Sequence, residues 1–155
     1  MRKMLKSKRG FTLSELLIAV LILGLVTAGA AVGVNASLKA YHASVQASEA
    51  RMLLSTLSES VMDELRYAEN ISADGDNPSY TSANYGIGAT LQDNDDGQIV
   101  AFTTGSSIIG TGAYNGLKAE IAYPYESGVF NVTITVKNGS KVLETTSFSV
   151  TPITE

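Results

Sequence analysis

The apolar residues of this chain are concentrated in one segment near its beginning. Residues 16–34 carry a single polar side chain, Thr27, and no charged side chain. As a helix, a segment of this length covers a bilayer core of about 30 Å. We therefore predict a membrane-spanning helix, whose side chains face lipid or other subunits because a small domain cannot bury them.

A second pattern begins at Asn35, where apolar residues recur at helical spacing among polar ones. No Pro or Gly occurs between Asn35 and Asn70, so the pattern predicts that the helix continues to about residue 68. Its polar side should include Glu64, Arg66 and Glu69, on a solvated or intersubunit face. Its apolar side chains fall into two groups, shifted in phase: Leu38, Tyr41, Val45 and Met52, then Leu54, Leu57, Val61, Leu65 and Ala68.

After Asn70 the pattern no longer has helical spacing. Residues 70–97 are rich in Asp, Asn, Ser and Gly, which predicts a polar connection. Four β-like runs follow, at 99–104, 117–123, 129–137 and 141–151. Within the third run, apolar residues at 130, 132, 134 and 136 alternate with polar ones, as in a half-buried strand.

The last two runs are joined by Asn138-Gly139, a strong hairpin signal. We favour a three-residue loop through Ser140, which would pair Phe130 with Phe148 and Val136 with Val142. A two-residue loop would give a different register. Together the patterns predict an α+β fold, in which an antiparallel sheet lies against the apolar face of the second half of the helix.

The distribution of charge predicts how the chain is oriented in the membrane. Five of the eleven basic residues precede residue 10, and the first acidic residue is Glu15. A basic stretch directly before an apolar span stays in the cytoplasm, so the remainder of the chain should lie outside. From Phe11 onward the chain is acidic, which gives no electrostatic reason to bind nucleic acid.

The chain has no cysteine, one histidine and no phosphate-binding glycine loop. These absences leave no catalytic set, so we expect no enzyme, no catalytic residue, no cofactor and no metal. The acidic run 93–96 before Gly97 raises the question of calcium. Its glycine comes one position early for an EF-hand and no glutamate closes the loop. A solvated hairpin turn is the preferred interpretation, with calcium left open.

Three interpretations fit the N-terminal segment: a permanent anchor, a signal peptide cut after Ala30, or a span that enters the membrane and later leaves it. The small residues 28–30 suit signal peptidase. Glu15 argues against the first two, because a carboxylate at the edge of a membrane span is costly and usually marks a function.

The third interpretation is supported by a resemblance. The processing site of type IV prepilins and type II secretion pseudopilins is similar to one string here, Lys8-Arg9-Gly10-Phe11-Thr12-Leu13-Ser14-Glu15, followed by Leu-Leu-Ile-Ala-Val-Leu. The resemblance implies cleavage between Gly10 and Phe11 by a prepilin peptidase, N-methylation of Phe11, and pairing of Glu15 with the N-terminal amine of a neighbouring subunit. This chain departs from the family in having Val32 where pilins commonly have a proline.

The resemblance also implies a pilin fold, with a long N-terminal α-helical stem. Its expected parts are a removed basic leader at 1–10, a transmembrane and assembly half of the stem at 11–34, an amphipathic half at 35–69, and a variable connection with the antiparallel β-sheet domain at 70–155.

The implied function is a structural subunit of a type IV pilus-like filament, a minor pilin or pseudopilin. Its partners would be prepilin peptidase, other pilin subunits, the cytoplasmic membrane before assembly, and the assembly machinery. It would first be a single-pass membrane protein and then part of a cell-surface or periplasmic filament. Pilus, secretion and DNA-uptake systems all remain open, and the alternative is a monomeric surface-binding protein, anchored or secreted.

Overall fold

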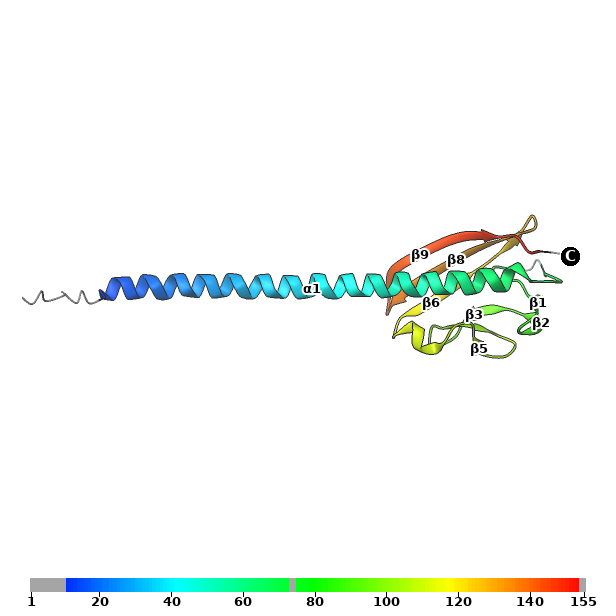
Figure 1. The fold of residues 1–155 in the computed structure, drawn as a ribbon, viewed down its shortest axis with the longest axis horizontal. Coiled ribbons are helices and arrows are strands. Elements are labelled where there is room, and N and C mark those ends of the chain that lie inside the picture. Colours follow the sequence, from blue (N-terminus) through cyan, green and yellow to red (C-terminus); the bar gives the residue numbers. More distant parts are fainter. Residues whose placement is uncertain (1–10, 73–74, 154–155) are drawn as a thin grey trace, which may run out of the picture. The chain divides into compact units, whose positions relative to one another are not determined.

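The computed structural model describes residues 11–72 and 75–153, so the expected leader at 1–10, with Gly10, lies outside the described residues. The chain divides into two compact units, Met1–Ala43 and Ser44–Glu155. Helix α1, Leu13–Arg66, contributes to both units (Figure 1).

In the first unit every described side chain is exposed. Thr27, the single polar side chain of the apolar segment, donates its hydroxyl to the carbonyl oxygens of Leu23 and Gly24, at 2.9 and 3.0 Å. Its hydrogen-bonding need is thus met inside the helix, as a lipid environment requires. α1 contains a stretch long and apolar enough to cross a membrane. The predicted helix is confirmed in length and composition.

In the second unit one face of α1 forms part of the core. The buried positions follow helical spacing, which places them in one row facing the sheet. They are Ala50, Leu53, Leu57, Val61 and Leu65. The prediction was wrong for Met52, which is 68% exposed. Leu53, one position further on and about 100° around the helix, takes its place in the core.

The main sheet has four antiparallel strands: β6 (Lys118–Ala122), β7 (Tyr125–Glu126), β8 (Val129–Asn138) and β9 (Lys141–Val150). β8 pairs with all three of the others. Its inner side chains, Phe130, Val132, Ile134 and Val136, are fully buried and join the core cluster with α1. The predicted alternation and the α+β class are confirmed.

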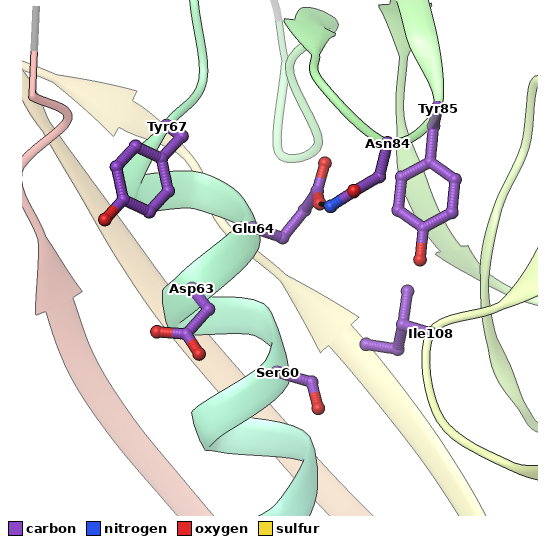
Figure 2. A pocket seen from close by; sticks show the side chains of 7 residues that line it. All are labelled: Ser60, Asp63, Glu64, Tyr67, Asn84, Tyr85 and Ile108. Carbon is purple, nitrogen blue, oxygen red and sulfur yellow. Dashed lines mark hydrogen bonds between the residues drawn. The ribbon is translucent and has the colours of Figure 1, made fainter.

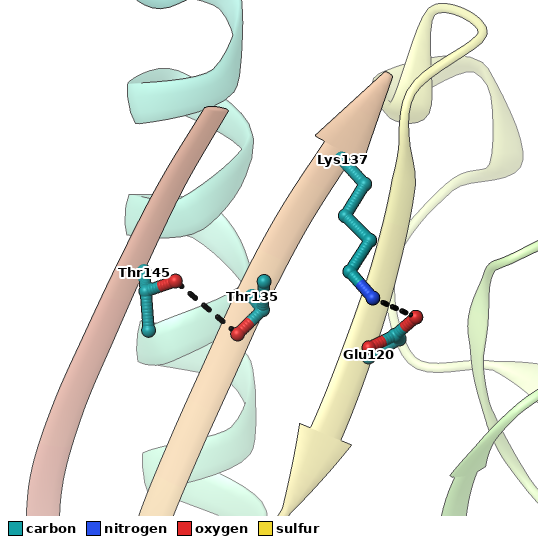
Figure 3. A network of polar contacts seen from close by, with 4 residues as sticks. All are labelled: Glu120, Thr135, Lys137 and Thr145. Carbon is teal, nitrogen blue, oxygen red and sulfur yellow. Dashed lines mark hydrogen bonds and ion pairs between the residues drawn. The ribbon is translucent and has the colours of Figure 1, made fainter. Parts of the chain in front are cut away.

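The outer face of the same sheet is polar (Figure 3). Lys137 of β8 forms an ion pair with Glu120 of β6, and the hydroxyl of Thr145 on β9 donates to that of Thr135 on β8 at 3.3 Å. Exposed pairs of this kind contribute at most about 1 kcal/mol each. They mark this face as solvated, in contrast to the apolar face against α1.

The predicted register of the β8–β9 hairpin was wrong. Asn138 pairs with Lys141, so the loop contains two residues, Gly139 and Ser140, and Phe130 pairs with Val150 instead of Phe148. The register shifts between Val136 and Lys137, where Leu143 is the additional residue on β9. This β-bulge restores the inward orientation of Phe148 and Val150, which the two-residue loop alone would have reversed.

Residues 70–97, expected to form a polar connection, contain three short strands. β1 (Tyr80–Ser82) pairs with β2 (Gly86–Ala89), and β3 (Leu91–Asp93) pairs with β4 (Ile99–Ala101). β5 (Ser106–Ser107) extends the second pair, and the 3-10 helix η1 (Thr111–Tyr114) leads into β6.

The acidic run 93–97 is the turn between β3 and β4, as the hairpin interpretation predicted. The N–H of Gly97 donates to Asn94 O at 2.8 Å, and that of Asn94 donates to Gln98 O at 3.0 Å. The carbonyl oxygen of Gly97 accepts the N–H of Ala119 at 2.8 Å. The turn is therefore attached to β6 through its backbone.

The end of the chain returns to the end of α1. The N–H of Ile153 donates to the carbonyl oxygen of Arg66 at 2.8 Å. The last carbonyl groups of a helix have no partner within it. Here the C-terminal segment supplies one.

Candidate functional site

Phe11 and Thr12 precede the first turn of α1, and the Phe11 side chain is 80% exposed. The N–H and the hydroxyl of Thr12 both donate to Oε2 of Glu15, each at 2.9 Å. In return the N–H of Glu15 donates to Oγ1 of Thr12 at 3.3 Å. This reciprocal arrangement is a capping box, which satisfies the free donors at the start of a helix.

The capping box gives Glu15 a local role that the sequence analysis missed. The signal was present in the spacing of Thr12 and Glu15, the Thr-x-x-Glu pattern of a helix start. The hydrogen bonds from Thr12 all use Oε2. Oε1 takes no part in these bonds, and the Glu15 side chain is exposed.

Of the three residues predicted for processing and assembly, the structure describes two. Phe11 and Glu15 lie four positions apart at the beginning of α1, both exposed, while Gly10 lies outside the described residues. The arrangement offers an exposed Phe11 and a carboxylate held in a fixed orientation by Thr12.

A family model for the prokaryotic N-terminal methylation motif matches residues 5–31. The chain carries the prepilin-type cleavage and methylation signature of type IV pilins and pseudopilins. The motif supports a pilin-like or pseudopilin-like precursor, and the expected resemblance is confirmed. The signature suggests a structural protein and implies processing by prepilin peptidase and assembly with other pilin subunits. With the apolar helix it is consistent with membrane anchoring. No curated protein and no solved structure matches the chain.

The second unit contains a polar groove of about 370 Å³ between the last turns of α1 and the β1–β2 connection (Figure 2). The side chain of Glu64 forms its base. Oε2 of Glu64 accepts the amide of Asn84 at 2.9 Å, and Oε1 accepts the hydroxyl of Tyr80 at 3.3 Å. The residues that line the groove are Ser60, Asp63, Glu64, Tyr67, Asn84, Tyr85 and Ile108.

The expectation that Glu64 lies on a solvated or intersubunit face was wrong, since only 8% of this residue is exposed. Its position, three residues after Val61 and one before Leu65, places it at the border of the buried row of α1. Burial raises the pKa of Tyr80, and the Glu64 carboxylate raises it further. The same two causes, in the same order, raise the pKa of Tyr85. Both tyrosines therefore stay neutral beside the carboxylate at physiological pH.

Within residues 11–72 and 75–153 no group of three or more His, Asp and Glu side chains is arranged to hold a metal ion. The groove brings together two carboxylates, Asp63 and Glu64, with two tyrosines. Such a set can accept hydrogen bonds and attract positive charge.

Proposed function

We propose that this protein is a structural subunit, a minor pilin or pseudopilin, of a type IV pilus-like filament. Prepilin peptidase would cut the chain between Gly10 and Phe11 and methylate the new amine of Phe11. The observation that carries the proposal is the signature over residues 5–31, which spans that bond. The exposure of Phe11, outside the regular helix, supports it because a protease needs an accessible, non-helical chain.

Before assembly, the apolar part of α1 would hold the precursor in the cytoplasmic membrane with the acidic domain outside. In the filament the same side chains would pack against the helices of other subunits. Large apolar residues are exposed along this part of the helix, including Leu17, Leu21 and Leu25 at 63, 63 and 67%. Burial of apolar surface contributes about 25 cal/mol per Å², so many such contacts supply the driving force.

Glu15 would pair with the N-terminal amine of a neighbouring subunit and set the axial register. Its Oε2 is engaged by Thr12, which leaves Oε1 to receive the ammonium group. A carboxylate and an ammonium are each costly in an apolar filament core, and pairing offsets much of that cost.

Mass spectrometry of the mature N-terminus tests the proposal. We expect a chain that begins at methylated Phe11 in cells with prepilin peptidase, and a full-length chain in cells without it. A chain that begins at Ala31, or an uncut leader in the presence of the peptidase, contradicts the proposal. Either result would favour the alternative of a released or anchored surface-binding protein.

A further inference from the structure

Glu64 is a nearly buried carboxylate whose described hydrogen-bond partners are neutral. It is 8% exposed, and its oxygens accept from the phenol of Tyr80 and the amide of Asn84. The ion pairs between described residues are Arg51–Glu144 and Lys137–Glu120, and neither reaches the groove. A buried carboxylate that lacks a cationic partner is unfavourable. A cation bound in the groove would relieve this.

The walls of the groove suit an organic cation. Tyr67 lies in the turn just after α1, and Tyr85 extends from the β1–β2 connection on the other side, with the Glu64 carboxylate reaching toward Asn84 between them (Figure 2). Asp63 lines the same space and adds a second negative charge, while no basic side chain of the described residues lines it. The faces of tyrosine rings attract cations. A groove of about 370 Å³ has room for a planar group on a methylene stem and is wide for a bare metal ion.

We propose that this groove binds a basic side chain, an arginine guanidinium, presented by a partner polypeptide. A guanidinium donates two parallel N–H groups to the two oxygens of a carboxylate, and its flat surface stacks on an aromatic ring. A lysine ammonium can do neither. The partner is a polypeptide because the groove is open: Tyr67 is 60% exposed, so a free small molecule would bury too little of its surface. Tyrosine and arginine are among the residues most enriched at the energetic centres of protein interfaces.

The inference is independent of the filament proposal. All residues of the groove lie in the unit Ser44–Glu155, and none belongs to the N-terminal signature. A chain with an unexpected mature N-terminus would still carry the groove unchanged.

A titration of the full chain in detergent micelles tests the inference, with N-acetyl-arginine amide as the probe and backbone amide NMR shifts as the measurement. We expect saturable shifts at Tyr67, Asn84 and Tyr85, with a dissociation constant on the order of millimolar for a fragment of this size. The matched control is N-acetyl-citrulline amide, which keeps the shape and loses the charge. It should bind at least about tenfold more weakly.

Two variants assign the binding to the groove. Glu64→Gln should weaken arginine binding about tenfold. Asp63→Asn should weaken it by a smaller factor and provides a test if Glu64→Gln disturbs folding, because Asp63 is exposed and has no role in the core. Glu126→Gln, an exposed site on β7, is the control and should bind arginine as the parent chain does.

Three outcomes would overturn the inference. Equal shifts with arginine and citrulline would show that charge is not recognised. Parent-like binding in both Glu64→Gln and Asp63→Asn would place the contact elsewhere. Shifts at the same amides with calcium chloride and none with the arginine probe would make the groove an inorganic cation site.

Discussion

The hydroxyl of Tyr123 accepts the backbone N–H of Leu91 at 2.7 Å and donates to the carbonyl oxygen of Pro78 at 3.2 Å. Leu91 and Pro78, which carry these two backbone groups, are both fully buried, so neither group has access to water. One phenol therefore connects the residue that follows β6 to the start of β3.

Tyr123→Phe should destabilise the protein by about 1–3 kcal/mol, because it leaves a buried N–H without an acceptor. The free energy of unfolding can be measured by urea titration of the full chain in detergent, followed by near-UV circular dichroism. Tyr125→Phe is the control: this tyrosine is half-buried and its hydroxyl makes no hydrogen bond to a described residue. Equal stability of the two variants would contradict the role of the Tyr123 hydroxyl.

Stability should fall steeply above about pH 10, the ordinary pKa of tyrosine. Burial raises the pKa of Tyr80, Tyr114 and Tyr123. Above that pH the unfolded chain releases these protons while the folded chain keeps them, so stability is complete below about pH 10 and lost as pH rises beyond it. Urea midpoints between about pH 8 and pH 11 measure the effect. Ionisation of all seven tyrosines without loss of the near-UV signal would contradict it.

Leu57→Ala should cost about 2–5 kcal/mol, because the side chain is fully buried between α1 and the sheet and its removal leaves a cavity. Met52→Ala, on the same helix at a site 68% exposed, should change stability by less than about 0.5 kcal/mol. The pair is compared by thermal unfolding. A larger effect at Met52 would mean that α1 is rotated about its axis, with a different face against the sheet.

Gly97→Ala should be more harmful than Gly128→Ala. Both glycines have positive φ, at 73° and 83°, where a side chain costs about 1–2 kcal/mol. At Gly97 a Cβ would also lie 2.5 Å from Cβ of Lys118 on β6, whereas nothing lies within 4 Å at Gly128. Overpacking adds about 1–3 kcal/mol, which the difference in unfolding free energy should reveal. Equal effects would mean that the turn can move away from β6.

Two variants separate the two roles assigned to Glu15. Glu15→Gln keeps an acceptor for the N–H and hydroxyl of Thr12 and loses the charge, whereas Glu15→Ala loses both. If Glu15 pairs with a neighbouring amine as proposed, both variants should enter filaments poorly. The amount of each variant in filaments sheared from the cell surface measures this. Only Glu15→Ala should also speed amide hydrogen exchange at the first turn of α1. Normal incorporation of Glu15→Gln would contradict the charge pairing and leave the capping role.

The features that the sequence predicted well are those encoded by neighbouring residues. The uninterrupted apolar segment gave the first part of α1, and strict alternation from Phe130 to Val136 gave β8. Such periodicities need no knowledge of the rest of the fold. The N-terminal motif is likewise defined by consecutive residues, and it matches the methylation motif.

The errors concern contacts between distant segments. The β8–β9 register depends on a bulge at Leu143, and no local signal marks one residue of a strand as additional. The burial of Glu64 depends on Tyr80 and Asn84, which reach it from the β1–β2 region. Strands of three or four residues, such as β1 and β3, are too short for alternation to be recognised.

The hydrogen bond from the N–H of Ile153 to the carbonyl oxygen of Arg66 affects when the second unit can fold. A carbonyl group at the end of α1 accepts a hydrogen bond from Ile153, which comes just after β9. During synthesis the ribosome still holds those residues after the helix has emerged. Contacts between distant parts of a chain form late and slow the folding of the whole. The second unit should thus complete its structure only after β9 and Ile153 have been synthesised.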